Sequence, residues 1–156
     1  FNFLCELSTK TNDTWMVKTH PDFGGEYSKY IQYERKVAKG VCSKYKNIHL
    51  LPSNITHNDI AKLKIDAVFT VNGTIGIDYP IFNIPVVNAS RNNPHINYNF
   101  NFHPKTINEL KNIILNFKIH KKKIEIKKDE IYEYYSIRNI FFSDELVTLN
   151  HQSSYE

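Results

Sequence analysis

The feature that most constrains the fold is an alternation of four short, largely apolar runs with longer amphipathic segments. The runs are Trp15–His20, Asn47–Leu51, Ala67–Val71 and Ile84–Asn88. Each has the length of a strand, and the segments between them have helical spacing. Strands of this kind that alternate with helices are typical of a parallel sheet covered on both faces. We therefore expect an α/β fold, a doubly wound, Rossmann-like parallel sheet of about four strands with helices on both faces.

Six segments are predicted to be helical. They are Phe3–Leu7, Glu26–Tyr45, Ser53–Lys64, Gly73–Phe82, Thr106–Phe117 and, as one or two amphipathic helices, Lys121–Leu149. Thr56 or Asn58 is expected to cap the third of these helices. We assign residues 1–120 to the Rossmann-like domain and residues 121–156 to a carboxyl-terminal helical extension that packs on it.

Composition describes an ordinary globular chain with a mild positive charge. It has 156 residues, of which 41% are hydrophobic and 23% charged, and a formal net charge of +4. Much of that charge comes from the lysines between His120 and Lys128, which favours anionic ligands or a weak association with a membrane surface. Nucleic-acid binding is not expected, because Asp129, Glu130 and Glu133 are interleaved with the tyrosines that follow the lysines.

Cysteine and histidine usage predicts neither disulfides nor a metal site. Cys5 and Cys42 lie among apolar residues and are expected to be reduced, buried thiols of a cytoplasmic protein. No window reaches the roughly 18 apolar residues of a membrane-spanning helix. No two of the candidate ligands share ligand spacing on a predicted helix; these candidates are His49, His57, His95, His103 and Asp59. The chain starts at Phe1 without a methionine, so we expect a fragment of a longer protein.

The string VFTVNGTIGID places small polar residues where a strand becomes a helix. The first N–H groups of a helix are unpaired and, together with the helix dipole, they favour a phosphate. Gly73 and Gly76 allow close approach, Asn72 and Thr74 add side-chain hydrogen bonds, and Asp78 could accept one from a ribose hydroxyl. The alternative interpretation is an ordinary helix start that follows a glycine turn, because the string matches neither dinucleotide nor P-loop motifs.

The string WMVKTHP ends a predicted strand at the same edge of the sheet. Lys18 and His20 lie on one face of that strand because side chains alternate, and Pro21 ends it. An imidazole can donate to a phosphate, and a lysine supplies positive charge. A lone histidine at a strand end is more often structural. Both strings, however, follow strands expected to be neighbours at the crevice where a doubly wound sheet reverses direction.

These residues carry a resemblance to a known family. VKTHP, then IDAVFTVNGTIGID and NIPVVNAS, resemble the carboxyl-terminal, donor-nucleotide half of GT-B glycosyltransferases, notably the Kdo-transferring and sialyltransferase-like enzymes of bacterial capsule synthesis. The resemblance covers roughly Trp15 to Leu115. In those families an HP pair and a later S/T-x-G-x-E turn bracket the nucleotide phosphates. Here Gly73 stands where a serine is common, and Asp78 is shorter than the usual glutamate.

The resemblance implies a glycosyltransferase of capsular or surface polysaccharide synthesis that uses a nucleotide-sugar, often CMP-linked, and no further cofactor or metal. It implies that His20 is catalytic, by neutralising the departing phosphate. The implied donor-nucleotide site comprises Lys18, His20, Pro21, Asn72, Gly73, Thr74, Ile75 and Asp78. The acceptor-side base would belong to an amino-terminal GT-B domain upstream of this chain, and a glycan would be the acceptor. The alternatives are a non-catalytic nucleotide-binding or assembly domain, a polyol-phosphate transferase and a sugar epimerase.

For three further histidines the sequence predicts only an approximate location. His57 precedes a predicted helix and is expected at the surface near its cap. His95 and His103 lie in or just beyond the Asn-rich loop that leaves the fourth strand on the ligand side. That position would allow contact with the base or the sugar of a nucleotide. Loop histidines with amide neighbours are usually solvent exposed, which is the competing expectation.

Overall fold

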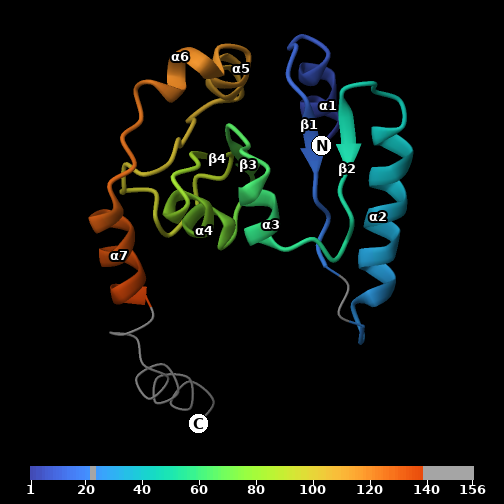
Figure 1. Ribbon diagram of the computed structural model, residues 1–156, viewed down its shortest axis with the longest axis horizontal. Helices are drawn as coiled ribbons and strands as arrows, with labels where there is room; N and C mark the ends of the chain where they lie inside the picture. Colours follow the sequence, from blue (N-terminus) through green and yellow to red (C-terminus); the bar gives the residue numbers. More distant parts are fainter. Residues whose placement is uncertain (22–23, 139–156) are drawn as a thin grey trace.

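The computed structural model describes residues 1–21 and 24–138, and it is mixed α/β (Figure 1). Its elements are α1 (Asn2–Ser8), β1 (Trp15–Val17), α2 (Ser28–Cys42), β2 (Ile48–Leu50), α3 (His57–Lys62), β3 (Val68–Thr70), α4 (Ile75–Ile81), β4 (Val86–Asn88), α5 (Ile107–Leu115), α6 (Phe117–Lys121) and α7 (Lys128–Ser136). All four predicted strands are present in the predicted order. Each contains three residues, fewer than the predicted runs.

The four strands form two separate parallel pairs. β1 pairs with β2, with Trp15 opposite Ile48, and β3 pairs with β4, with Val68 opposite Val86. Within the described residues no strand ladder joins β1 to β3, so the predicted single sheet of four strands is not formed. The rings of Trp15 on β1 and Phe69 on β3 nevertheless stack, with centroids 5.3 Å apart. The two pairs are therefore in side-chain contact without sharing backbone hydrogen bonds.

The second edge of β4 is also occupied. Phe102 forms an isolated parallel bridge with Val87. The N–H of Asn88 donates to the carbonyl of Phe102, and the N–H of Phe102 donates to the carbonyl of Val86. Both donor–acceptor distances are 2.9 Å. The end of the Asn-rich loop thus returns to the sheet, which the sequence pattern did not predict.

Helices cover both faces of the β3–β4 pair, as expected. Successive side chains of a strand point to opposite faces, and the two fully buried valines of β4 follow this rule. Val86 packs with Ile60 of α3 and Tyr79 of α4. Val87 packs in a different cluster, with Leu7 of α1 and with Leu110, Ile113 and Ile114 of α5. The strand pair is the central layer of this half of the molecule.

The β1–β2 pair packs against α1 and α2. Cys5, Cys42 and Ile48 form one buried cluster that joins the two helices to β2. Both thiols are free and buried, as predicted, and burial raises the pKa of each. Figure 1 shows α2 at the outer edge of this half.

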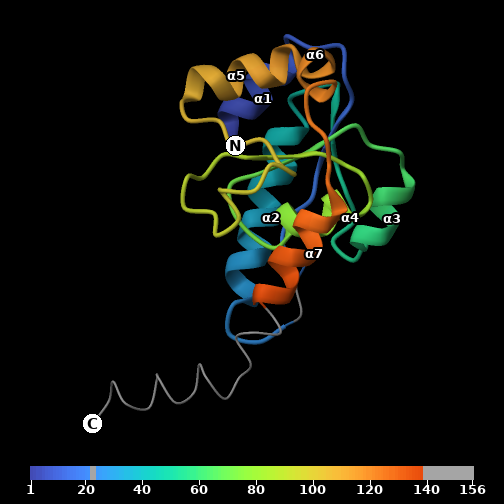
Figure 2. The same cartoon turned by 90° about the vertical axis from the view of Figure 1, so that its left-hand side faces the viewer.

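The carboxyl-terminal helix α7 packs on α4. Ile77 of α4, Phe100 of the Asn-rich loop, and Ile131 and Tyr134 of α7 form a fourth buried cluster. Figure 2 shows α7 running beside α4. The predicted helical region 121–149 is therefore divided: α6 ends at Lys121, α7 spans Lys128–Ser136, and residues 139–149 lie outside the described residues.

Candidate functional site

The first predicted string follows β1 and is tied to α2. Thr19 is buried, and its hydroxyl accepts a hydrogen bond from a guanidinium nitrogen of Arg35 at 3.2 Å. Arg35 also donates to the carbonyl of Leu51 at 3.2 Å, so one side chain of α2 holds the segments that follow β1 and β2. His20 is exposed, and its Nδ1 lies 3.0 Å from the carbonyl oxygen of Pro21. The imidazole is thus accessible to a ligand.

In the second predicted string, Val68–Asp78, one backbone N–H has a different partner from the one predicted. The N–H of Gly73, expected to face a phosphate, donates to the side-chain oxygen of Asn72 at 2.8 Å. Gly73 has φ +127°, in the region that favours glycine. α4 begins at Ile75, two residues after the predicted start, and Thr74 makes no side-chain cap bond. Asn72, Gly73 and Thr74 are exposed, so two polar side chains here remain open to solvent.

The predicted site residues are brought together only in part. A cavity of about 880 Å³ lies between the two strand pairs, within the usual range for small-molecule sites. Lys18 and Ile75 both line it, together with the stacked rings of Trp15 and Phe69. His20 and the exposed residues 72–74 do not line it. Within the described chain no hydrogen bond or ion pair connects the two strings.

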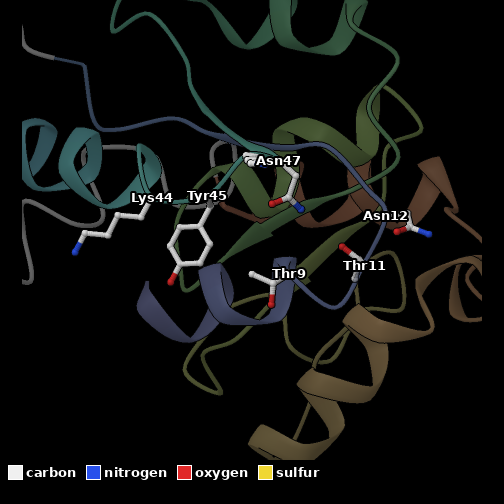
Figure 3. Close-up of a pocket in the computed structure, with 7 residues that line it drawn as sticks. Thr9, Thr11, Asn12, Lys44, Tyr45 and Asn47 are labelled. Atoms are coloured by element: carbon white, nitrogen blue, oxygen red, sulfur yellow. The ribbon is translucent and has the colours of Figure 1, made fainter.

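A shallower pocket of about 390 Å³ lies between the end of α1 and the loop from α2 to β2. Its lining contains none of the predicted site residues. Figure 3 shows Lys44 pointing away from Asn47 and Thr11, so the polar groups do not converge. Asn47 bonds to the carbonyls of Ser8 and Asp13, which gives it a structural role. We do not assign a function to this pocket.

A third polar region, at the carboxyl end of β4, is buried. Its members are the side chains of Asn88, Asn93, His95, Asn101 and His103, called the polar cluster below. Each has at least one buried nitrogen or oxygen atom without a hydrogen-bond partner. Buried polar groups in folded proteins are almost always paired, and an unpaired one costs about 1–3 kcal/mol. A concentration of such atoms in one place therefore requires an explanation.

The expectation that the loop histidines are exposed is wrong for His95, which is 1% exposed. Its ring stacks on Phe100, with centroids 5.7 Å apart, and meets Tyr134 of α7 edge-on. Burial, followed by the nearby His103 and Arg138, lowers the pKa of His95 to about 4. Burial also lowers the pKa of His103. Both rings are therefore neutral at pH 7.

His57 is also less exposed than predicted. It is half-buried in the first turn of α3, where Thr56 is the cap, as one of the two predicted alternatives had it. Its Nδ1 lies 2.9 Å from the hydroxyl of Tyr79 on α4. Burial and the charge of Asp78 raise the pKa of Tyr79 to about 12. This contact joins two helices, and we assign it a structural role.

Sequence reasoning missed the polar cluster as a unit. The available signal was the alternation of amide and imidazole residues with Phe100 and Phe102 in a segment called a loop. Burial of the Phe100 side chain places this part of the chain in the core, and neighbouring polar residues such as Asn101 are buried with it.

Comparisons with protein-family models, curated proteins and solved structures found no match to this chain. Within residues 1–21 and 24–138, no group of three or more His, Cys, Asp or Glu side chains is arranged to hold a metal ion. In the same residues, no helix has both the length and the apolar character needed to cross a bilayer.

Proposed function

We propose that this chain is the donor-nucleotide half of a GT-B glycosyltransferase that acts in capsular or surface polysaccharide synthesis, with a CMP-sugar as the first donor to test. The observation that carries the proposal is positional. Lys18–Pro21 follows β1 and Asn72–Thr74 follows β3, and each of these strands belongs to a parallel pair. Loops at the carboxyl ends of parallel strands are where α/β folds bind nucleotides.

The proposal includes a continuous sheet in the order β2-β1-β3-β4. The stacking of Trp15 on Phe69 supports it, because the two strands that would pair are already in contact. Pairing of β1 with β3 would close much of the cavity between the two strand pairs. It would also bring Lys18–Pro21 beside Asn72–Thr74 at one edge of the sheet, the switch point of a doubly wound fold.

The proposed roles follow from what each group can donate. The exposed imidazole of His20 and the ammonium of Lys18 stabilise the leaving phosphate, and the side chains of Asn72 and Thr74 add hydrogen bonds. A preorganised donor of this kind contributes roughly 3 kcal/mol to the transition state. The acceptor-side base comes from a second domain in this proposal, because a GT-B site forms between two domains. The setting proposed is the cytoplasm, at the inner face of the membrane.

The test is calorimetric titration of the 156-residue chain with CMP, UMP, GMP and cytidine. We expect CMP to bind more tightly than cytidine, because the proposed groups recognise phosphate. His20→Ala should weaken CMP binding by about tenfold to a hundredfold, the range for a hydrogen bond to a charged group. His49→Ala, at another exposed histidine, is the matched control and should bind CMP as the wild type does.

Four results would count against parts of this proposal. A folded chain that binds none of the four ligands contradicts nucleotide binding. A preference for UMP retains the site and removes CMP. Loss of thermal stability in His20→Ala with unchanged affinity would show that His20 is structural. A protein with both domains that binds nucleotide but transfers no sugar would favour the non-catalytic alternative.

A further inference from the structure

We infer that the polar cluster at the carboxyl end of β4 is a subsite for uncharged hydroxyl groups of a ligand's sugar, and that the turn at residues 91–94 moves aside to admit them. This inference rests on the proposed function, because it supplies a second part of the same nucleotide-sugar site. It begins from a position: Asn88 is the last residue of β4 and pairs with Thr70 of β3, two residues before Asn72. The cluster is therefore at the strand edge that the proposed site uses.

The chemistry of the unpaired atoms selects hydroxyl groups. The side-chain oxygens of Asn88, Asn93 and Asn101 are acceptors without donors, and the amide nitrogen of Asn88 is a donor without an acceptor. Both ring nitrogens of His95 and of His103 are also unpaired. A neutral imidazole offers one donor and one acceptor. A phosphate, which accepts only, would leave the three amide oxygens unpaired, whereas hydroxyl groups both donate and accept.

Charge leads to the same class of ligand. None of the five side chains in the cluster carries a charge at pH 7, since the amides are neutral and both imidazoles are held in the neutral form by burial. A buried anion would have no compensating cation among them, because Arg138, the cation that acts on His95, is an exposed residue outside the cluster. The hydroxyl groups of a pentose or a pyranose need none.

The cluster is closed in this structure by a turn that makes few hydrogen bonds to other elements. Among the described residues, the hydrogen bonds of residues 91–97 stay within the turn or reach its ends: Asn92 donates to the side chain of Ser90, Asn93 to the carbonyl of Ser90, Ile96 to Asn93, and Tyr98 to His95. Arg91, Asn92 and Pro94 are exposed. The ends of the turn are held firmly: the N–H of Ser90 donates to the carbonyl of Val71, and the rings of His95 and Tyr98 pack on Phe100 and Tyr134. Only residues 91–94, between these ends, can move without breaking those contacts.

The experiment uses Asn88→Leu in the full chain, because leucine has nearly the same shape as asparagine and removes both unpaired atoms. Calorimetry with CMP, 2′,3′-dideoxycytidine 5′-monophosphate and CMP-N-acetylneuraminate, and with UMP and UDP-N-acetylglucosamine, separates the two sources of hydroxyl groups. If the ribose binds here, Asn88→Leu should weaken CMP and UMP about five- to tenfold and leave the dideoxy ligand unchanged. If the transferred sugar binds here, only the nucleotide-sugars should lose that affinity.

Asn47→Leu is the matched control. Unlike Asn88, Asn47 makes side-chain hydrogen bonds, and it lies between α1 and β2, so its replacement should lower the melting temperature and leave every affinity unchanged. Asn88→Leu should not lower the melting temperature, because it removes unpaired buried atoms. Equal affinities of wild type and Asn88→Leu for all ligands overturn the inference and leave a structural or water-filled cluster.

A second measurement does not depend on any variant folding. In the wild-type chain with ¹⁵N-labelled histidine, the ring signals of His95 should shift on saturation with a hydroxyl-bearing ligand and not with inorganic phosphate. Unshifted signals at saturation overturn the inference. A wild type that binds none of the ligands overturns this inference and the proposed function together. A wild type whose affinity depends on His20 but not on Asn88 overturns the inference alone.

Discussion

The ring of His95 fills the space that Gly76 leaves open in the first turn of α4. A Cβ at residue 76 would lie 2.6 Å from Nε2 and 2.7 Å from Cε1 of that ring, and 3.1 Å from the side-chain oxygen of Asn88. The side-chain amide of Asn101 donates to the carbonyl of the same glycine. The start of α4 and the Asn-rich loop are thus fitted to each other at one residue without a side chain.

Gly76→Ala should therefore destabilise the chain by about 1–3 kcal/mol, the usual effect of an added methyl group in a closely packed site. Gly40 provides the control, since it lies inside α2 with nothing within 4 Å of a built Cβ. Gly40→Ala should stabilise the chain by about 0.5–1 kcal/mol, because alanine is the better helix former. Urea denaturation of both variants measures the difference. A Gly76→Ala variant as stable as Gly40→Ala would contradict the contact with His95.

Stability should fall as the pH is lowered from about 6.5 to about 4. The pKa of His95 is lowered from 6.5 to about 4 in the folded state, so the unfolded chain binds more protons between these values. The expected loss is about 3 kcal/mol across that window, and His103 adds to it in the same direction. Below pH 4 the contribution of His95 is fully lost.

Denaturation curves at half-unit pH steps measure this loss. His95→Gln should flatten the pH dependence, whereas His49→Gln, at an exposed histidine, should keep the wild-type slope. A His95→Gln variant with the wild-type slope would show that other groups cause it.

Both thiols should be protected in the folded chain. Cys5 and Cys42 are 2% and 4% exposed, and burial raises the pKa of each, so little thiolate is present at pH 8. A thiol-specific colorimetric reagent should react slowly with the native protein and with both thiols at once in 6–8 M urea. Rapid native reaction of one thiol would contradict the packing of α1 on α2.

The threonines that precede α5 and α4 should differ in their effect on stability. Thr106 accepts a hydrogen bond from the N–H of Glu109 at 3.1 Å, so Thr106→Ala should cost about 1 kcal/mol of stability. Thr74 precedes α4 without such a bond, and Thr74→Ala should leave the melting temperature almost unchanged. Under the proposed function Thr74→Ala should still weaken CMP binding. Equal loss of stability in both variants would contradict the difference between the two helix starts.

Local sequence signals were sufficient for the elements themselves. The apolar runs predicted all four strands in order, and the i, i+3, i+4 spacing predicted α2 and α5. Thr56 was one of two predicted caps, and the bond from the N–H of Asp59 confirms it. Such features depend on residues within one or two turns of one another, which is why a sequence pattern reports them.

Sequence patterns could not predict the geometry of the site, because that geometry depends on distances between segments far apart in the chain. That Lys18 and Ile75 line one cavity, while His20 and Asn72 lie outside it, is set by how the two strand pairs pack. The backbone N–H of Gly73 was expected to be free for a phosphate, but it donates to the side-chain oxygen of the preceding Asn72. Asparagine side chains commonly accept such local hydrogen bonds in turns.

By itself, then, the sequence determined the α/β alternation, the order of the strands, and the burial of both cysteines, because hydrophobic periodicity and local hydrogen bonding act over a few residues. Only the tertiary structure decided that the strands form two pairs, that Phe102 returns to β4, and that His95 is buried against Gly76. Pairing and burial are properties of surfaces brought together from distant segments. The polar cluster is the clearest instance, since Asn93, His95 and Asn101 belong to a segment predicted as a loop and are nevertheless buried in the folded chain.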